Sequence, residues 1–285
     1  MSGALGHDLS TKRFWRHFTK DTLSGVGGLA VLIGLYDVIF PGVVARADRA
    51  AVFLVVGVSL LYGLWRAWPR PIEESYVTPN TVIRIVRGDL LAETCHLVVG
   101  TCDTFDTRVP DVIARSSVQG QFLETILNND VDELDRQIDT ALAGIASVGT
   151  VEKLGKRRRY PIGTVAVLRE SRRKHFLLAY TVMEADNQAH GTADGVWRSL
   201  LNLWDVVRRE SNGEPVAIPV IGGGQSRLSQ ILPAQDSIRF IAMSFILASR
   251  YEKVCGELRI VVTPQDYERL DRLEVQSFLS SLRAS

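Results

Sequence analysis

The sequence is poor in cysteine and histidine. Its 285 residues include three cysteines, Cys95, Cys102 and Cys255, and five histidines. No two cysteines form a CxxC pair, so neither a disulfide framework nor a zinc knot is supported. The scattered histidines offer no metal-ligand spacing and no Ser-His-Asp or Cys-His arrangement. We therefore expect no metal, no cofactor and no catalytic residues, and a reducing cytoplasm around the cysteines.

The chain also lacks an excess of charge of either sign. Thirty-three Lys and Arg residues against 32 Asp and Glu give a formal net charge of +1, which argues against a dedicated nucleic-acid binder. Hydrophobic residues at 46% and charged residues at 23% are typical of globular proteins and exclude a disordered chain. Neither GxxxxGK[ST] nor GxGxxG occurs, which disfavours a P-loop ATPase and a Rossmann dehydrogenase.

The apolar residues gather in the first seventy positions. One run extends over eighteen residues from Leu23 to Phe40, with Asp37 as its one charged residue. At about 1.5 Å per residue it is about 27 Å long, just enough for the hydrocarbon core of a bilayer. A second run covers residues 50–68 after a short link. We therefore expect an antiparallel transmembrane hairpin, with helices at about 22–40 and 50–68. A signal peptide fits poorly, and a buried hairpin in a soluble protein is the alternative.

Basic residues flank this hairpin. By the positive-inside rule they place both ends on the cytoplasmic side, although two arginines in the link, Arg46 and Arg49, weaken the bias. We therefore expect a multi-pass protein of the inner (cell) membrane, with the lipid bilayer as a partner. The flanking residues are Lys12, Arg13, Arg16 and Lys20 before the first run, and Arg66 and Arg70 at the end of the second.

Small residues recur on one face of the first run. Gly27, Ala30 and Gly34 follow helical spacing, and Asp37 continues the same face. Small residues at such spacing let helices approach closely in lipid, and an ionisable residue in a span is a functional candidate. Asp37 also lies close enough to the membrane interface to reach water. Because two helices cannot enclose a water-filled path, conduction requires a homo-oligomer, and we expect a tetramer or larger.

The remaining chain alternates between strand-like and helix-like segments, which predicts an α/β unit with a largely parallel sheet. The expected strands are at 82–86, 97–99, 163–168, 176–181, 216–220 and 258–262, and the expected helices at 131–145, 194–210, 237–249 and 266–282. The resulting division is a basic N-terminus at 1–20, the hairpin at 21–68, a linker at 69–80 and the α/β unit at 81–285.

Three glycine-containing turns are candidate ligand sites in this unit. In open α/β sheets, ligands bind beyond the carboxyl ends of the strands. Glycines there leave backbone N–H groups free to face an anion, and a helix N-terminus adds a favourable dipole. A glycine run alone is weak support, because ordinary tight turns use the same residues. The turns are Gly88-Asp89-Leu90, residues 116–121 and residues 219–227.

Taken together, these segments resemble the macro domain, an ADP-ribose-binding fold, over about residues 81–275. The arrangement is similar to the variant found in Thoeris antiphage effectors, in which a two-helix hairpin precedes the macro domain. The resemblance implies a macro-like three-layer α/β/α sandwich over 81–285. The matching segments are Gly88-Asp89-Leu90, Leu97-Val98-Val99, residues 100–107 (GTCDTFDT), 117–121 (SVQGQ), 160–164 (YPIGT) and 218–228 (IPVIGGGQSRL).

The resemblance implies a sensor. In Thoeris systems a TIR-domain partner converts NAD into an ADP-ribose-type signal. The resemblance implies that the signal for this chain is ADP-ribose joined to histidine. The membrane effector then assembles and kills the infected cell. Asp89 would bind the adenine amino group with Leu90 beside the ring, although Asp89 is equally suited to capping the next turn. Thr101, Cys102, Asp103 and Phe105 would line the distal ribose. The diphosphate would contact Ser117, Val118, Gln119, Gly120, Gln121, Ile221, Gly222, Gly223, Gly224 and Gln225. Further expected ligand-binding residues are Pro219, Ser226 and Arg227.

One departure from the family pattern bears on catalysis. Macro-domain hydrolases usually carry Asn-Ala-Ala-Asn after the second strand, and here the matching stretch is Gly100-Thr101-Cys102-Asp103. Both asparagines are missing, which favours binding without turnover, although Asp103 or Asp106 is able in principle to position a water. The alternatives are a membrane-tethered ADP-ribosyl hydrolase and an ADP-ribose reader that recruits partners.

Overall fold

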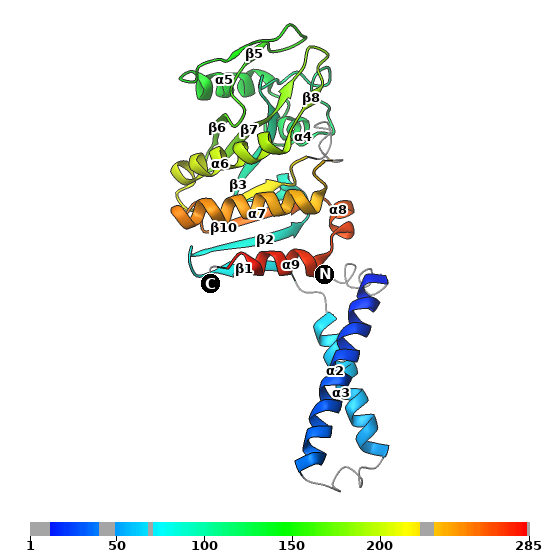
Figure 1. The fold of residues 1–285 in the computed structure, drawn as a ribbon. Helices are drawn as coiled ribbons and strands as arrows, with labels where there is room; N and C mark the ends of the chain where they lie inside the picture. The colour runs from blue at the N-terminus through cyan, green and yellow to red at the C-terminus, as the bar shows by residue number, and fades with distance from the viewer. Residues whose placement is uncertain (1–11, 40–48, 68–70, 223–230, 284–285) are drawn as a thin grey trace. The chain divides into compact units, whose positions relative to one another are not determined.

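The computed structural model describes residues 12–39, 49–67, 71–222 and 231–283. The chain divides into two compact units, Met1–Pro71 and Ile72–Ser285. The first is a pair of helices, α2 (Lys12–Ile39) and α3 (Arg49–Ala67) (Figure 1). The second contains the sheet and the remaining helices.

The two helices of the hairpin approach each other through glycines that the sequence pattern did not single out. A Cβ on Gly63 would collide with Thr22 Oγ1, and one on Gly25 would lie 3.3 Å from the Tyr62 ring. Glycine at position 63 therefore permits the close approach of the two helices, whereas a Cβ at position 25 would make a tight contact with the Tyr62 ring. By contrast, a Cβ on Gly27 or Gly34 would meet nothing within 4 Å. The predicted small-residue face is therefore exposed within one chain, and the side chain of Asp37 lies outside the described residues.

The prediction of a multi-pass inner-membrane protein is wrong. Among the described residues, no helix combines the length and the apolar character needed to cross a bilayer. A spanning helix needs about 20 predominantly apolar residues. The apolar run in α2 is eighteen residues long, contains four glycines and Asp37, and its last residue lies outside the described part.

Eight of the described strands of the second unit form one mixed sheet in the order β1-β2-β10-β9-β3-β7-β6, with β8 paired to β7. A separate two-stranded sheet contains β4 (Gly149–Thr150) and β5 (Arg158–Arg159). The neighbours from β2 to β7 run parallel, whereas β1, β6 and β8 pair antiparallel. The predicted α/β class is confirmed, with a mixed sheet. The strands are β1 (Ile72–Tyr76), β2 (Thr81–Arg87), β3 (His96–Cys102), β6 (Val165–Glu170), β7 (Arg173–Met183), β8 (Ala189–His190), β9 (Val216–Pro219) and β10 (Glu257–Val262).

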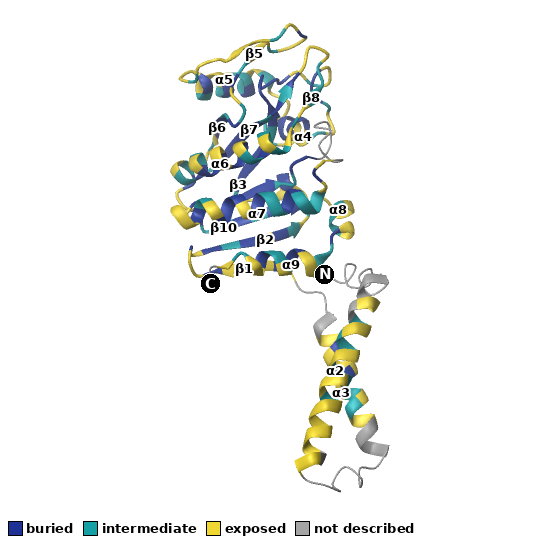
Figure 2. Ribbon diagram, viewed as in Figure 1, coloured by how far each residue is buried: buried dark blue, intermediate teal, exposed yellow. Residues whose placement is uncertain are grey.

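Helices cover both faces of this sheet, because alternate strand residues point to opposite sides. Val98 and Ile260 pack with α6 (Ala193–Glu210), α7 (Ala234–Tyr251) and α9 (Arg272–Ser281), which lie across the near face in Figure 1. Leu97, Val99 and Val261 pack with α4 (Val118–Thr125) and α5 (Val131–Leu142) on the other face. The buried side chains accordingly form a hydrophobic cluster on each face of the sheet. Figure 2 shows the buried positions along the strands and on parts of the helices that cover them.

Two boundaries differ from the sequence prediction. The edge strand β1 begins inside the predicted linker at 69–80 and pairs with β2 over five residues. The predicted helix at 266–282 is two helices, α8 (Pro264–Arg269) and α9, separated at Leu270. The break follows from Asp271, whose side chain accepts a hydrogen bond from the Glu274 amide at 3.1 Å and so starts a new helix. The sequence Asp-x-x-Glu carried this signal.

The helical layer on the near face depends on one large side chain. Trp204 of α6 is fully buried, donates a hydrogen bond to Ser244 Oγ at 2.9 Å and packs edge-on against Phe245. We expect Trp204→Ala to lower the free energy of unfolding by about 3–5 kcal/mol in urea titrations. Trp197→Ala, at a half-buried position on the same helix, is the control and is expected to cost less; equal losses would contradict this view of the core.

Candidate functional site

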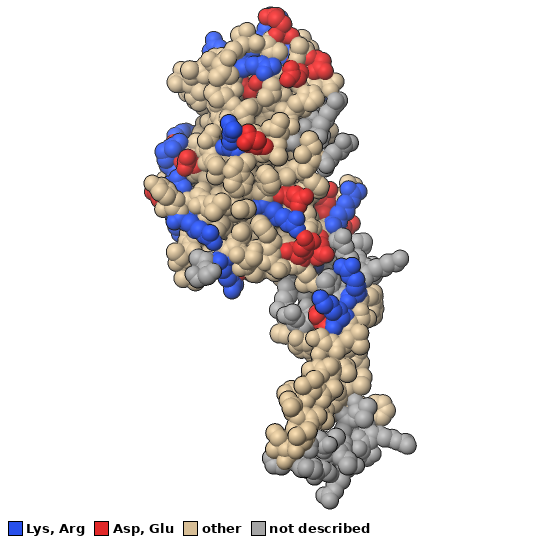
Figure 3. All heavy atoms as spheres, viewed as in Figure 1, with Lys and Arg blue, Asp and Glu red and all other residues tan. Residues whose placement is uncertain are grey.

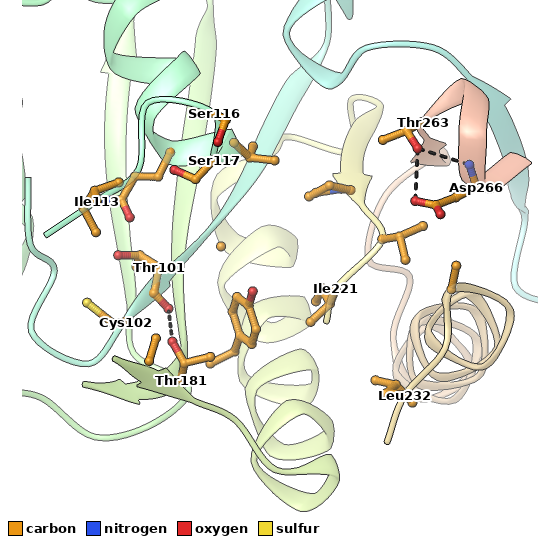
Figure 4. Close-up of a pocket in the computed structure, with 18 of the residues that line it drawn as sticks. Thr101, Cys102, Ile113, Ser116, Ser117, Thr181, Ile221, Leu232, Thr263 and Asp266 are labelled. Atoms are coloured by element: carbon orange, nitrogen blue, oxygen red, sulfur yellow. Dashed lines mark hydrogen bonds between the residues drawn. The ribbon is translucent and has the colours of Figure 1, made fainter. Parts of the chain in front are cut away.

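A cavity of about 860 Å³ opens at the carboxyl ends of the parallel strands β3, β7, β9 and β10. Parallel strands end at the same edge of a sheet, so the loops that follow them meet there. Figure 4 shows Thr101, Cys102 and Thr181 at one end of the cavity, Ile221 in the middle and Thr263 and Asp266 at the other end. Its size suits a nucleotide-sized ligand.

The N-terminus of α4 forms one wall of the cavity. Ser117 is its N-cap: Oγ accepts a hydrogen bond from the Gly120 amide at 3.0 Å and donates one to Ala114 O at 2.7 Å. Gly120 is required because a Cβ there would collide with Ala114 O. The amides of Val118 and Gln119 have no partner inside their own helix, as at every helix start, and both residues line the cavity.

The N-terminus of α7 forms the opposite wall. Its N-cap is Pro233, which provides no side-chain hydrogen bond to the helix. The first-turn residues Ala234 and Gln235 line the cavity. Ser237 Oγ accepts a hydrogen bond from the Ile221 amide at 2.9 Å and so fixes the loop after β9 against α7. Two helix N-termini, one without a capping side chain, thus face one cavity, which favours a bound anion.

The end of β3 is irregular where it borders the cavity. The register with β7 shifts between Thr101 and Cys102, so that both residues line the cavity. Such bulges redirect side chains. Gly100 lies under the ring of Tyr180, which a Cβ would strike. The two residues are almost completely buried: Thr101 is 4% exposed and Cys102 is 3% exposed. Cys102 Sγ lies 3.3 Å from Thr104 Oγ1.

The turns after β2 and β9 lie at the same edge, on either side of β10. The Gly88 amide donates to Val262 O at 3.0 Å, and the Val220 amide donates to Val261 O at 3.3 Å. Asp89 and Leu90 nevertheless do not line the cavity. Asp89 caps the short helix η2 (Leu90–Ala92), with Oδ1 accepting from the Leu91 amide at 3.0 Å. Leu90 is buried in the core behind it.

Asp103 and Phe105, predicted to line the distal ribose, are instead buried away from the cavity. Asp103 Oδ1 accepts a hydrogen bond from the Met183 amide at 2.8 Å, and Oδ2 lies 3.3 Å from Arg159. Burial raises the pKa of the Asp103 carboxyl, against the lowering effect of these partners. Phe105 packs edge-on against Tyr160 with ring centroids 5.7 Å apart. Both residues stabilise the loop that follows β3.

Asp106 forms a buried ion pair with Lys153, the first residue of a run at 153–159 that contains five Lys and Arg residues (KLGKRRR). Its Oδ2 lies 2.6 Å from Lys153 Nζ, and both side chains are almost completely buried. The same oxygen accepts from the Lys156 amide at 2.8 Å. On the other side, the Asp106 carbonyl accepts from Gln119 Nε2 at 2.5 Å. We call this buried pair of Lys153 and Asp106 the clasp, and it connects to the α4 N-terminus through Gln119. The rest of the basic run is mostly exposed and includes β5 (Arg158–Arg159), which forms a hairpin with β4 (Gly149–Thr150).

Other predicted contacts fall outside the cavity or outside the described residues. Gln121 is exposed, and its side-chain amide donates a hydrogen bond to Ser116 O at 3.0 Å. Gly222 has a φ of +106°, a conformation that favours glycine, and it does not line the cavity. The predicted contacts outside the described part are Gly223, Gly224, Gln225, Ser226 and Arg227. Thr101, Cys102, Ser117, Val118, Gln119, Pro219 and Ile221 line the cavity.

Comparison with known proteins identifies the family. The family described as "Thoeris protein ThsA, Macro domain" matches residues 83–263, more than half of the chain. The chain belongs to the ThsA macro-domain family. The Thoeris protein ThsA of Bacillus amyloliquefaciens (strain Y2) is 22% identical over 244 residues, which cover 82% of this chain and 80% of the relative.

Solved macro-domain structures are also similar to this chain. The Oceanobacillus iheyensis macrodomain with ADP is 13% identical, with 75% of this chain and 96% of that chain covered and a TM-score of 0.48. The Oceanobacillus iheyensis macrodomain with MES bound is 12% identical, with 74% and 99% covered and a TM-score of 0.43.

Sequence reasoning missed the parts of this ThsA-family site that follow β7 and β10 and the start of α7. Among the described residues that line the cavity, the charged ones are Asp266 and Arg269, which lie at one end of it. The start of α7 carries no capping signature, since Pro233 replaces a Ser, Thr, Asp or Asn. The expected parallel sheet was the signal that could have indicated them, because the loops that follow parallel strands meet at one edge. The missed lining residues include Tyr180, Thr181, Met183, Asn187, Leu232, Pro233, Ala234, Gln235, Thr263, Asp266 and Arg269. Within the described ranges, no three His, Cys, Asp or Glu side chains cluster so as to hold a metal ion.

The buried clasp predicts a large effect of one substitution. Lys153→Met leaves the Asp106 carboxylate buried without its counter-charge, so we expect a loss of about 3–5 kcal/mol in the free energy of unfolding. Arg198→Ala removes an exposed pair with Asp194 and is the control, with an expected change below about 1 kcal/mol. Comparable effects in chemical denaturation would show that the buried pair has no special weight.

Proposed function

We propose that this chain binds an ADP-ribose derivative in the cavity, with the diphosphate between the N-termini of α4 and α7. The convergence of these two helix starts on one cavity is the observation that carries the proposal. Each start contributes backbone N–H donors and the positive end of a helix dipole. Such a site holds a diphosphate without a lysine, in agreement with the missing P-loop motif.

The ends of the cavity suit the two ends of such a ligand. The adenosine would lie toward β10, near Asp266, because this carboxylate lines the cavity and carboxylates accept hydrogen bonds from an adenine amino group. The distal sugar would lie toward β3 and β7, beside Thr101 and Cys102. This orientation is the one that the resemblance to macro domains implies.

We further propose that the chain is a binder and not an enzyme. The two carboxylates that sequence reasoning held available for positioning water are both engaged elsewhere: Asp103 with Met183 and Arg159, and Asp106 with Lys153. Neither lines the cavity. A general base must reach the reacting water, and these two do not. No cofactor is needed for this function.

The proposed signal is histidine-linked ADP-ribose, made from NAD by a TIR-domain partner. Membership of the Thoeris ThsA macro-domain family supports a role in antiphage defence, in which the signal converts the chain into an assembling form that leads to cell death. Moving a two-state equilibrium from 1:99 to 99:1 needs about 5.5 kcal/mol of differential affinity. A ligand that is bound at both ends and at its diphosphate makes enough contacts to supply this difference in binding free energy.

The surface of the hairpin supports self-assembly. Large apolar side chains on α2 and α3 are exposed in the single chain, and the middle of the hairpin is uncharged on the face drawn in Figure 3. Exposed apolar surface of this extent favours association. We propose a homo-oligomer, a tetramer or larger, formed through the hairpin. The most exposed of these side chains are Leu23, Val31, Leu32, Val38, Ile39, Phe53, Leu54 and Leu61.

A substitution at the start of α4 tests the diphosphate site. Val118→Asp puts a negative charge at the first helical position, where it suits the helix dipole but repels a phosphate. We expect unchanged or higher thermal stability and an affinity for ADP-ribose at least about tenfold lower, measured by calorimetry. Ala193→Asp makes the same change at the start of α6, outside the lining residues, and is expected to leave affinity unchanged. Equal affinities for both variants would contradict the proposed site.

A ligand panel tests the identity of the signal. At a hundred times its dissociation constant, a ligand adds about 2.7 kcal/mol of stability, which raises the melting temperature clearly. We expect histidine-linked ADP-ribose to stabilise the chain at lower concentration than ADP-ribose, NAD or cyclic ADP-ribose. The same samples distinguish a hydrolase: release of free ADP-ribose by catalytic amounts of the chain would replace the binder with an enzyme.

Assembly through the hairpin has its own test. Gly34→Leu fills the exposed small-residue face of α2, so we expect ligand-dependent growth in mass, followed by light scattering, to be lost while ligand binding persists. Gly28→Leu adds the same side chain on another face of α2 and is the control. Assembly that survives Gly34→Leu would exclude this face, and absence of any ligand-dependent assembly would favour a reader that only recruits partners.

A further inference from the structure

Helix α7 carries large apolar side chains on the face opposite to the sheet. Ile241 and Phe245 are fully buried in the core. Phe240, Met243 and Leu247 recur at three- and four-residue spacing, which places them together on the other side of the helix. Met243 is 43% exposed, and Leu247 is exposed to a similar extent. The core of one chain does not account for this apolar stripe, because the outer face of such a helix normally carries polar residues.

Helix α6 extends this stripe sideways. The ring of Trp197 packs edge-on against the ring of Phe240, with centroids 5.7 Å apart. Leu201 lies one turn further along α6 and is also exposed. Figure 3 shows uncharged surface over the middle of α7 and charged side chains near both of its ends. Apolar patches rimmed by polar residues are typical of protein–protein contact surfaces. The residues that we call the α6–α7 patch are Trp197, Leu201, Phe240, Met243 and Leu247.

Two charged residues of opposite sign lie at the ends of the stripe. Asp236 is seven positions before Met243, and Arg250 is seven positions after it, so both lie on the same face of α7. Asp236 accepts a hydrogen bond from Arg239 at 2.7 Å, and Arg250 donates one to Leu282 O at 2.7 Å. Each keeps capacity for another partner, because a carboxylate accepts several hydrogen bonds and a guanidinium donates five. The stripe therefore has an acidic end, an apolar middle and a basic end.

This pattern is complementary to its own reverse. When two α7 helices pack antiparallel about a two-fold axis at Met243, Asp236 of each copy lies opposite Arg250 of the other. Phe240 then faces Leu247 of the second copy across the apolar middle. A two-fold interface uses the same patch on both copies and must be self-complementary. We propose that the α6–α7 patch is the surface through which the second unit pairs with a second copy of this chain, in an interface separate from the hairpin.

Cross-linking at the proposed axis tests this pairing on the full chain. Met243→Cys puts a thiol on the two-fold axis, where it faces its own copy across helix axes about 8–10 Å apart. We expect a short bismaleimide to yield a covalent dimer of this variant well above the parent chain, whose three free cysteines give the baseline. Leu273→Cys is the matched control, because Leu273 is 44% exposed but lies on α9, outside the patch. Equal yields for the two variants would overturn the proposal in favour of a different occupant.

Charge reversal in the Met243→Cys background gives a second test. Asp236→Arg and Arg250→Asp each place like charges opposite one another, so we expect each to lower the cross-linking yield about fivefold. The variant with both reversals restores opposite charges across the axis and is expected to recover the yield of Met243→Cys alone. Within one copy, fourteen positions of helix, about 21 Å, separate the two residues, so recovery requires contact between copies.

Undiminished yield in the single reversals, or a double reversal that does not recover, would overturn the two-fold arrangement. Neither test adds a nucleotide, so their outcomes are independent of the proposed function.

Discussion

The site depends on one constraint, the shared edge at which parallel strands end. Strands β2, β10, β9, β3 and β7 run in parallel, so their loops and the helices that follow meet on one side of the sheet. The helix starts of α4 and α7 then face each other across the cavity. Their unpaired amides need an acceptor, and a diphosphate provides several.

The loops around the cavity are held by contacts that the binding function does not use directly. Asp103 and Asp106 are buried. Asp103 contacts the Met183 amide and Arg159, and Asp106 pairs with the buried Lys153. Gln119 connects this network to the start of α4. A rigid frame of this kind presents amides in fixed directions, which lowers the cost of ordering the site when a ligand binds. Asp103 and Asp106, the two residues that the sequence left available for positioning a water, therefore hold the loops around the cavity in place.

Much of this arrangement was predictable from sequence, and the exceptions have physical causes. Alternation of strands and helices predicted the α/β unit, and shared strand polarity predicted that the turns after β2 and β9 lie at one edge. The roles of Asp103 and Asp106 depend on partners 80 and 47 residues away, which local patterns do not reveal. The start of α7 was missed because Pro233 is not a capping residue. The membrane-spanning prediction rested on the length of the run, whereas no helix in the described part of the chain is both long and apolar enough to cross a membrane.

The most direct measurement follows the backbone amides of the two helix starts during addition of ADP, using nitrogen-15 NMR of the full chain. The account predicts large, saturating shifts at Val118 and Gln119 of α4 and at Ala234 and Gln235 of α7. The amides of Ala193 and Asp194, at the start of α6, should remain in place. Shifts confined to residues outside the cavity, or saturation without movement of either helix start, would contradict it.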